Sequence, residues 1–254
     1  MLLAIDAGNS EVKLGLFQGS TLLEKWRLVR DNVRFRNEYH THVEKLFDGS
    51  KFSAQDVEAI IISSVIARSS TLKWLAEDFF KVTPVFVDHT MRTGLTILYD
   101  DPSKLGTDRI VDSVAAVEKY GAPCIVVDFG TATTFNAISS AREFLGGIIV
   151  PGIMTAFNAL IARTANLEEV SFSCPLHVIG TSTYGALQSG LFFGTIDMVD
   201  ALIKRIREEM GGSPKVIATG GLAGWLELRS EYIEEFDENL TLDGLRIIYE
   251  MNKA

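Results

Sequence analysis

The sequence predicts an α/β protein made of two similar lobes with a cleft between them. A strand–turn–strand hairpin opens each half of the chain, and helical segments follow each hairpin. In addition, an acidic residue ends the first strand of both hairpins, at Asp6 and at Asp128. Elements in this order pack as helices against sheets, and a cleft between two such lobes is a common place for a ligand.

The first half is predicted to begin with three strands and to continue with alternating helices and strands. Apolar runs of four or five residues indicate buried strands, whereas apolar residues three and four apart indicate one face of a helix. The predicted strands cover residues 2–6, 12–17, 21–29, 59–62 and 85–87, and the predicted helices cover 37–47, 71–80 and a segment from Thr107 onward.

The second half repeats this order. Its predicted strands cover residues 124–128, 131–138, 144–150 and 215–218, and its predicted helices cover 153–164, 183–210 and 241–252. We place the lobe boundary near residues 101–120, which are expected to be helical from about Thr107 and to contain no flexible linker. We expect an N-terminal lobe over residues 1–115 and a C-terminal lobe over residues 116–254.

The composition is that of a soluble globular protein with an acidic surface. The 254 residues are 47% hydrophobic and carry a formal net charge of −9, which argues against a nucleic-acid-binding surface. The chain opens with an apolar strand rather than a signal peptide, and no run approaches the roughly 18–20 apolar residues of a membrane span. The two cysteines, Cys124 and Cys174, form no disulfide framework. We therefore expect a cytoplasmic protein with no membrane partner.

The two hairpin turns carry the clearest chemical pattern. Asp6-Ala7-Gly8-Asn9-Ser10 and Asp128-Phe129-Gly130-Thr131-Ala132-Thr133-Thr134 each follow an apolar strand. Glycine lets a backbone approach a ligand closely, turn amides can point at an anion, and a carboxylate at the strand end can hold a cation. Two such hairpins would bind a metal–nucleotide phosphate without a P-loop. The alternative is an ordinary turn, in which Asp and Asn bond to their own backbone.

Two further motifs add to this pattern. One lies between a strand and a helix and reads Thr219-Gly220-Gly221-Leu222-Ala223-Gly224. Its glycines would allow close approach of an adenine or ribose, although paired glycines are also common in connections from a strand to a helix. Gly106-Thr107-Asp108-Arg109 begins a helix, where Thr107 could cap the first turn and Asp108 would be stabilised as an anion. An anionic carboxylate can accept the proton of a substrate hydroxyl during phosphoryl transfer. The alternative is an exposed ion pair at the helix start.

Taken together, these motifs resemble those of type III pantothenate kinases, which belong to the wider group of actin, sugar kinases and heat-shock chaperone ATPases. Gly146-Gly147-Ile148-Ile149-Val150-Pro151-Gly152 and Gln188-Ser189-Gly190 also stand in the order and spacing of that family. The resemblance runs from residue 2 to the closing 240–245 segment. It implies two ribonuclease-H-like lobes of the actin-like ATPase type.

The resemblance also implies a reaction. The family transfers the ATP γ-phosphate to the primary hydroxyl of pantothenate, which gives 4′-phosphopantothenate in the first step of coenzyme A biosynthesis. Asp108 would be the base that takes the hydroxyl proton. The implied cofactors are ATP, Mg²⁺ and a monovalent cation, K⁺ or NH₄⁺, and the implied partner is a second copy of the chain in a homodimer.

The site residues carried over from the family fall into three groups. The ATP phosphates would lie against Asp6, Ala7, Gly8, Asn9, Ser10, Glu11, Val12, Lys13 and Thr131, with Asp6 organising Mg²⁺. Pantothenate would lie against Tyr99, Gly106, Thr107, Asp108, Arg109 and Thr183. Asp128 matches the monovalent cation position.

The chain departs from the family pattern at three places. Ser10 stands where Thr is typical, so the hydroxyl is kept. Lys13 stands where an apolar residue is more usual, either as an extra phosphate contact or as a solvent-facing strand residue. Gly180-Thr181-Ser182-Thr183 replaces the usual Gly-Lys-Asn-Thr, which puts the affinity in doubt but not the activity.

Two other functions fit parts of the pattern. One is a nucleotide-binding regulatory factor of the same fold without kinase activity. Four charged residues in one cleft, Asp6, Asp108, Arg109 and Asp128, argue against it. The other is a relative with a different phosphate acceptor, such as a sugar kinase or an exopolyphosphatase. Tyr99, Asp108-Arg109 and Thr183 in one pattern favour pantothenate over these acceptors.

Overall fold

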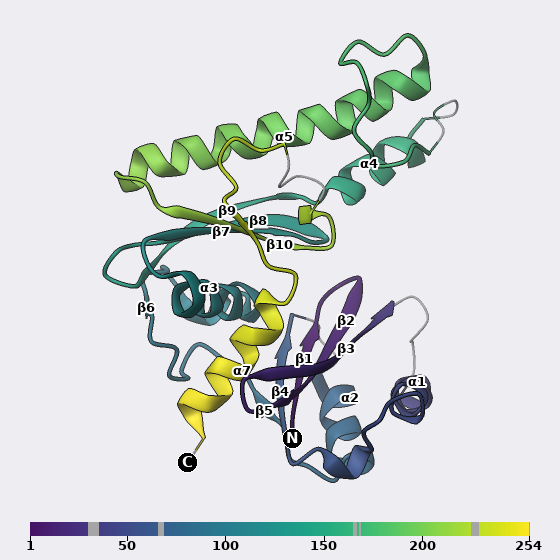
Figure 1. The fold of residues 1–254 in the computed structure, drawn as a ribbon, viewed down its shortest axis with the longest axis vertical. Helices are drawn as coiled ribbons and strands as arrows, with labels where there is room; N and C mark the ends of the chain where they lie inside the picture. Colours follow the sequence, from purple (N-terminus) through teal and green to yellow (C-terminus); the bar gives the residue numbers. More distant parts are fainter. Residues whose placement is uncertain (30–35, 66–68, 165–166, 168, 225–228, 254) are drawn as a thin grey trace. The chain divides into compact units, whose positions relative to one another are not determined.

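The computed structural model describes residues 1–29, 36–65, 69–164, 167, 169–224 and 229–253. These residues form two compact units. Unit 1 comprises Met1–Leu95, Tyr99–Glu118 and Asn239–Ala254, and unit 2 comprises Thr96–Leu98 and Lys119–Glu238. Each unit contains one β-sheet, and Figure 1 labels its strands and helices.

Unit 1 is built on a five-stranded sheet with the order β3-β2-β1-β4-β5. Its strands are β1 (Leu2–Ala7), β2 (Glu11–Gln18), β3 (Thr21–Val29), β4 (Ala59–Ser64) and β5 (Val85–Phe86). β2 is antiparallel to both β1 and β3, whereas β1, β4 and β5 run parallel. The helices are α1 (Arg36–Asp48), α2 (Ser69–Trp74), most of α3 (Thr107–Tyr120) and α7 (Leu240–Asn252).

The central strand of this sheet is covered on both faces. Every residue of β1 is buried, as expected for a strand that reads as a continuous apolar run. α7 packs against β1, β2 and β4 and buries Leu242, Leu245 and Ile248. The sequence-based division at residues 115 and 116 assigns this helix to the C-terminal lobe, but its apolar face belongs to the core of unit 1.

Unit 2 is built on a six-stranded sheet with the order β11-β10-β7-β8-β9-β6. Its strands are β6 (Thr96–Ile97), β7 (Cys124–Phe129), β8 (Ala132–Ile138), β9 (Glu143–Pro151), β10 (Lys215–Gly220) and β11 (Glu235–Phe236). The helices α4 (Ile153–Ala162) and α5 (Thr183–Met210) belong to the same unit.

The two sheets share one topology. β7, β8, β9, β10 and β11 repeat the order of β1, β2, β3, β4 and β5. The directions also agree, because β8 is antiparallel to β7 and β9 whereas β7, β10 and β11 run parallel. The prediction of two similar α/β lobes is therefore confirmed at the level of strand order.

Helix α5 is the longest helix in the described part of the chain. By length and composition it meets the criterion for a membrane span, with a mean hydropathy of 1.3 over its best window. The sequence analysis had expected no such segment. Phe192, Val199 and Ile203 of α5 are buried in the core cluster with the β7 and β10 side chains, as in a core helix of a globular unit. The same window is only 28% buried, so much of its apolar surface lies outside this core.

Local differences from the predicted elements have simple causes. The helix predicted over 71–80 consists of α2 followed by a π-helical turn over Leu75–Phe79. β6 and β11 were not predicted, because their residues Thr96-Ile97 and Glu235-Phe236 form no apolar run, unlike those of the equally short β5. The other predicted strands and helices lie within three residues of the observed ones.

Candidate active site

A polar row crosses the ends of three neighbouring strands in unit 1. Asp6 of β1 is in register with Lys13 of β2 and with Ser63 of β4. Residues paired in this way lie on one face of a sheet, with neighbouring strands about 4.8 Å apart. Asp6 is 9% exposed and Ser63 is fully buried, so the row is largely closed to water. It places a carboxylate, an ammonium group and a hydroxyl side by side.

The turn between β1 and β2 lies at the same edge. The Gly8 amide donates to the Glu11 carbonyl at 3.0 Å and closes the hairpin, while Asn9 and Ser10 are exposed at its tip. Lys13 lies 3.6 Å from Glu11, measured from Nζ to Oε1, and its side chain is only 15% exposed. The alternative that Lys13 faces open solvent is therefore wrong.

The start of α3 is tied to this row. The Thr107 hydroxyl forms a hydrogen bond of 3.0 Å with the hydroxyl of Ser63. Thr107 is the first helical residue rather than the cap, and the Gly106 carbonyl accepts from the amides of Arg109 and Ile110. The expected capping role of Thr107 is replaced by a bond that anchors the helix to β4.

Asp108 is held by its own neighbours. The Arg109 amide donates to Asp108 Oδ1 at 2.8 Å. A Cβ atom at position 106 would lie 2.5 Å from the same oxygen, so a side chain there would force the Asp108 carboxylate to move from this position. Tyr99 contributes a ring whose centroid is 5.8 Å from the guanidinium carbon of Arg109.

The electrostatics of Asp108 are a balance of opposing effects. Burial raises the pKa of Asp108 above its ordinary value, since it disfavours the charged form. The Arg109 amide and the positive charges of Arg109 and Lys13 act in the opposite direction. Asp108 is therefore a carboxylate of increased basicity, which suits a proton acceptor.

The second hairpin lies in unit 2 and is fastened to α4. The Thr131 carbonyl accepts from the Gly152 amide at 3.0 Å and from the Thr155 hydroxyl at 2.7 Å. The Thr131 side chain remains exposed at the tip of the turn. These bonds fix the β7–β8 turn against the start of α4.

Asp128 lies next to the end of β10. Gly220 has a left-handed conformation with φ of 97°, and a Cβ atom there would lie 2.6 Å from Asp128 Oδ1. The strand therefore needs glycine to pass beside the carboxylate. The close approach of β10 to Asp128 explains the glycine at position 220 better than the adenine contact considered from the sequence. Both reasons for a glycine can hold at once.

Thr183 is the first residue of α5 and is exposed. Ser182 caps this helix by accepting from the Gly185 amide at 3.1 Å. The predicted residues thus form two groups. Unit 1 brings together the 6–13 hairpin, Tyr99 and the 106–109 segment, and unit 2 holds Asp128, Thr131 and Thr183.

The sequence analysis missed Ser63, and it named Thr134 and Thr219 only as members of longer motifs. Ser63 follows the apolar strand of residues 59–62, and Thr134 and Thr219 are register partners of Asp128. Ser63 and Thr219 each come directly after an apolar run, whereas Thr134 follows Thr133; the pairing of these residues with other strands was not visible in the sequence. Among the described residues, no cluster of three or more His, Cys, Asp or Glu side chains could hold a metal. A cation at Asp6 or Asp128 would need further oxygen ligands from hydroxyls, backbone or phosphate.

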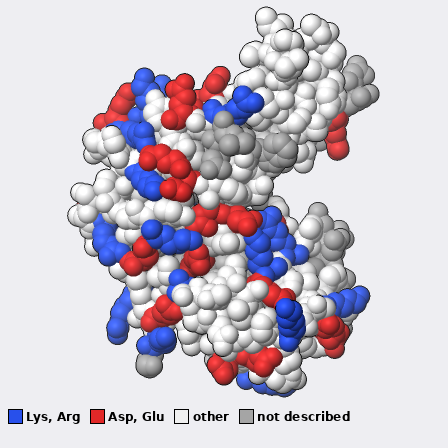
Figure 2. Space-filling view, in the orientation of Figure 1, with Lys and Arg blue, Asp and Glu red and all other residues white. Residues whose placement is uncertain are grey.

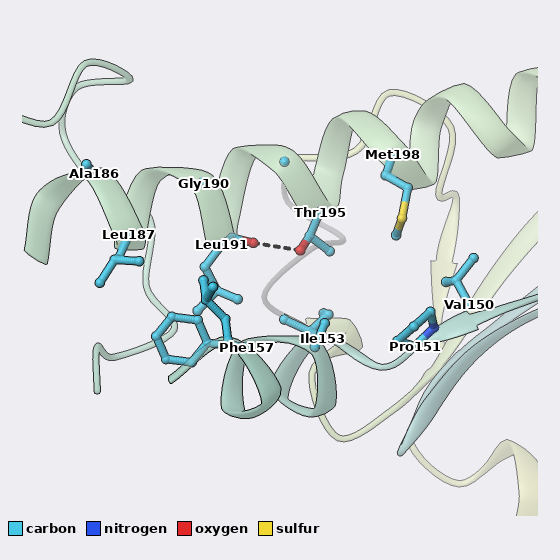
Figure 3. Close-up of a pocket in the computed structure, with 13 residues that line it drawn as sticks. Val150, Pro151, Ile153, Phe157, Ala186, Leu187, Gly190, Leu191, Thr195 and Met198 are labelled. Carbon is cyan, nitrogen blue, oxygen red and sulfur yellow. Dashed lines mark hydrogen bonds between the residues drawn. The ribbon is translucent and has the colours of Figure 1, made fainter. Parts of the chain in front are cut away.

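A separate groove of about 510 Å³ lies between α4 and α5. In Figure 3, Phe157 of α4 lies below Leu187 and Leu191 of α5, and Val150 and Pro151 of β9 close one end. None of the described lining residues is charged, and the Thr195 hydroxyl donates within its own helix to the Leu191 carbonyl at 2.6 Å. Such a lining does not suit a phosphate ligand.

Comparisons with known proteins give one family. The model of the type III pantothenate kinase family matches residues 2–205. The chain is 43% identical over 253 residues to the type III pantothenate kinase of Halalkalibacterium halodurans, covering 99% of this chain and 100% of the relative. It is 45% identical over 255 residues to that of Myxococcus xanthus, covering 100% of both chains.

Solved structures of more distant proteins share the fold of this chain. A putative 2-dehydro-3-deoxygalactonokinase from Sinorhizobium meliloti aligns with a TM-score of 0.63 and 16% identity, covering 100% of this chain and 98% of the other. A conserved putative Baf family transcriptional activator from Campylobacter jejuni aligns with a TM-score of 0.59 and 21% identity, covering 98% of each chain. At these identities the likeness concerns the fold alone, and it agrees with the predicted actin-like ATPase class.

Proposed function

Because this chain belongs to the type III pantothenate kinase family, we propose that its two strand-end sites transfer the γ-phosphate of ATP to the primary hydroxyl of pantothenate. The product is 4′-phosphopantothenate, and the reaction opens coenzyme A biosynthesis. The observation that carries this proposal is the identity of 43–45% to pantothenate kinases over essentially the whole chain. The buried carboxylates at the expected positions support it.

Asp108 is the proton acceptor in this proposal. Its carboxylate is oriented by the Arg109 amide and anchored through Thr107 to Ser63. A base of raised pKa accepts the proton of the pantothenate hydroxyl more readily than an ordinary aspartate. Phosphoryl transfer needs mainly positioning and charge neutralisation, so this one proton acceptor is sufficient acid–base machinery.

The 6–13 hairpin and Thr131 bind the ATP phosphates. Asp6 would hold the Mg²⁺ that enters with ATP, directly or through water, and the phosphates would supply further oxygen ligands. Lys13, next to Asp6 on the neighbouring strand, offsets negative charge on the phosphates. Mg²⁺ neutralises charge on the transferred group when it is bound.

Pantothenate binds at Tyr99, the 106–109 segment and Thr183. Arg109 is 5% exposed and stacks on Tyr99, which holds its planar fork in one orientation. Such a fork matches the carboxylate of pantothenate. Asp128 holds the monovalent cation, K⁺ or NH₄⁺, which would supply a fixed positive charge beside the second hairpin.

The homodimer uses unit 2. The apolar groove between α4 and α5 continues into exposed apolar side chains, which are Met154, Leu160, Leu176, Val178, Ile179 and Tyr184. Figure 2 shows that the visible surface around this end of α5 carries few charged side chains. An apolar surface of this kind favours a second copy of the chain as its occupant. The enzyme would be cytoplasmic, and the acidic net charge argues against nucleic acid as a partner.

The regulatory alternative receives little support. The likeness to a putative transcriptional activator has 21% identity and therefore concerns the fold alone. The same is true of the sugar kinase likeness at 16% identity.

The test is an assay of phosphate transfer. The protein is incubated with Mg·ATP and pantothenate, and the product is followed by its mass, with glucose and glycerol as control acceptors. We expect phosphopantothenate, and more of it in KCl than in NaCl of equal ionic strength. ATP binding without any phosphorylated product would favour the regulatory function instead.

A further inference from the structure

The chain passes between unit 1 and unit 2 four times, because unit 1 has three segments and unit 2 has two. Two of these passages involve helix ends. The last turn of α3 passes from unit 1 into unit 2 between Glu118 and Lys119, and the chain returns between Glu238 and Asn239, directly before α7. Helix α3 therefore carries the proposed base Asp108 in its first turn and ends in the other unit.

On the unit 2 side, these two passages are bound to each other. The Lys119 ammonium group lies 2.5 Å from Asp237 Oδ2, and the Tyr120 hydroxyl donates to the same oxygen at 2.9 Å. The Asp237 side chain is only 8% exposed, so solvent ions screen this pair weakly. The Lys119 ammonium group also lies 5.9 Å from the centroid of the Tyr120 ring. We call Lys119, Tyr120 and Asp237 the α3 clamp.

The α3 clamp is attached to the strand that ends beside Asp128. The Asp237 amide donates to the Ala218 carbonyl of β10 at 2.9 Å, which continues the pairing of β11 with β10. Ala218 is followed by Thr219, which is the register partner of Asp128. A short series of bonds within unit 2 thus connects the last turn of α3 with the strand end at the second hairpin.

Helix α3 itself connects the clamp with the base. It has 14 residues, which corresponds to a length of about 21 Å. It contains neither Pro nor Gly, the usual causes of a sharp kink, and every residue from Arg109 to Val117 is buried. Such a helix moves as one body. A change of direction at its last turn therefore displaces the Asp108 carboxylate in its first turn.

We infer that Asp237 is a positioning residue for the proposed phosphoryl transfer. By binding Lys119 and Tyr120 it sets the direction of α3, and through α3 it sets the position of the Asp108 carboxylate. The inference rests on the proposed function for the role of Asp108. Its new content is a part in catalysis for three residues that contact neither ATP nor pantothenate in that proposal.

The size of the expected effect follows from the kind of reaction. Phosphoryl transfer depends mainly on how the reacting groups are positioned. A displacement of roughly 1 Å at a reacting group can lower a rate by about 10²-fold. The binding contacts of ATP and pantothenate do not include the α3 clamp, so its loss should lower kcat more than it raises either KM.

The end of α5 offers a matched control. Arg207 in the last turn of α5 lies 2.8 Å from Glu234 Oε1, and the Glu234 amide donates to the Val216 carbonyl of β10 at 3.0 Å. An ion pair of the same kind thus joins a helix end to the same strand. Helix α5 lies wholly within unit 2, so breaking its ion pair should not displace Asp108.

The first test compares Asp237→Asn, which keeps the shape and removes the charge, with Glu234→Gln. We expect Asp237→Asn to lower kcat by about tenfold or more, with KM values for Mg·ATP and pantothenate within about twofold of the wild type. Glu234→Gln should keep the wild-type kcat. An unchanged kcat in Asp237→Asn, beside an active wild type, would overturn the inference and leave the proposed function intact. A wild type that forms no phosphopantothenate would refute the proposed function, and the inference with it.

The second test asks whether the loss acts through Asp108. Asp237→Asn is combined with Asp108→Asn, which has no base left to position. We expect the double variant to have the kcat of Asp108→Asn alone, so that the two losses do not add. Losses that multiply in full would show that Asp237 acts on stability or on another group, which contradicts the inference.

Variants of Lys119 decide the question if Asp237→Asn fails to fold. The Lys119 side chain is 30% exposed, so this position tolerates substitution better than the buried carboxylate does. Lys119→Met breaks the ion pair and should lower kcat, whereas Lys119→Arg can bind the same carboxylate and should keep kcat near the wild-type value. Equal kcat values in Lys119→Met and Lys119→Arg would rule out the positioning role.

Discussion

Asp108 must be ionised to accept a proton, although its burial favours the protonated form. Replacing it with the isosteric amide removes the base and keeps the shape. We expect Asp108→Asn to lower kcat by roughly 10²–10⁴, with ATP affinity nearly unchanged. Steady-state kinetics and a direct ATP titration measure the two quantities. Unchanged turnover would remove Asp108 from the mechanism.

The same substitution should stabilise the protein. Burial raises the folded-state pKa of Asp108 above its unfolded value. The folded protein therefore holds the Asp108 proton more tightly than the unfolded chain does. The resulting stabilisation is present at low pH and is lost as the pH rises through the raised pKa. At neutral pH the buried charge is therefore a cost that asparagine does not carry. We expect a higher free energy of unfolding for Asp108→Asn at pH 7, measured by urea titration. The difference should shrink as the pH falls toward the ordinary range of an aspartate.

Lys13 is predicted to contribute to the ionisation of Asp108, after the larger effects of burial and of Arg109. Its positive charge lowers the pKa of Asp108, so Lys13→Met should raise that pKa and move the acidic limb of the kcat/KM profile to higher pH. Arg27 of β3 is the register partner of Lys13 and is exposed, which makes Arg27→Met a matched control. An acidic limb at the wild-type pH in Lys13→Met would mean that Lys13 acts on phosphate alone.

The sequence was informative for these residues to different degrees. The glycine and hydroxyl residues around Asp6 and Asp128 form local motifs, so their pattern can be recognised in one segment. Ser63, Thr134 and Thr219 obtain their meaning from pairing with other strands, and no local window contains that information. Lys13 was recognised as a departure from the family pattern, but its contact with Glu11 and its effect on Asp108 required the structure.

At the scale of elements, a hydrogen bond between side chains joins α3 to β4. The hydroxyls of Ser63 and Thr107 are 3.0 Å apart in a partly buried position. We expect Ser63→Ala to lower the free energy of unfolding by about 0.5–1.5 kcal/mol and to raise the KM for pantothenate, because the 106–109 segment loses its anchor. A double-mutant cycle with Thr107→Val, followed by urea unfolding, measures the coupling. A coupling energy near zero would show that the bond does not position the helix.

Long elements were predictable because their own residues determine them. β1 and β7 are continuous apolar runs, and α5 was predicted with its observed bounds of 183 and 210. The helix over 71–80 instead changes to a π-helical turn after Trp74. β6 and β11 form only through pairing with β9 and β10, so local propensity carries no signal for them.

At the scale of the whole molecule, the repeated topology exceeds what the sequence reveals. In the sequence, only the Asp-x-Gly turns indicate that the two halves share a topology. The strands do not indicate it, because many combinations of apolar residues of suitable size can form the same strand. Helix α7 shows the limit of dividing a chain by linear position. Its buried face, including Leu245, completes the core of unit 1 although it lies at the end of the sequence.

The assembly prediction belongs to this scale as well. A groove of about 510 Å³ without charged lining, beside exposed side chains such as Leu160 and Tyr184, would leave a large apolar surface in water if the chain were monomeric. We expect Leu191→Glu, which adds a charge to the groove, to convert a dimer into a monomer in sedimentation velocity experiments. Val29→Glu adds the same charge at an exposed position of unit 1 and should leave the dimer intact.

Activity measured on the same two variants shows whether the dimer matters for catalysis. If the partner subunit completes the pantothenate site, the monomeric Leu191→Glu protein should have a higher KM for pantothenate, whereas its Mg·ATP affinity should remain close to that of the wild type. Equal losses for both substrates would indicate damage to the fold of unit 2 rather than loss of the partner. A wild-type chain that sediments as a monomer at micromolar concentration would contradict the assembly itself and would leave the α4–α5 groove without its proposed occupant.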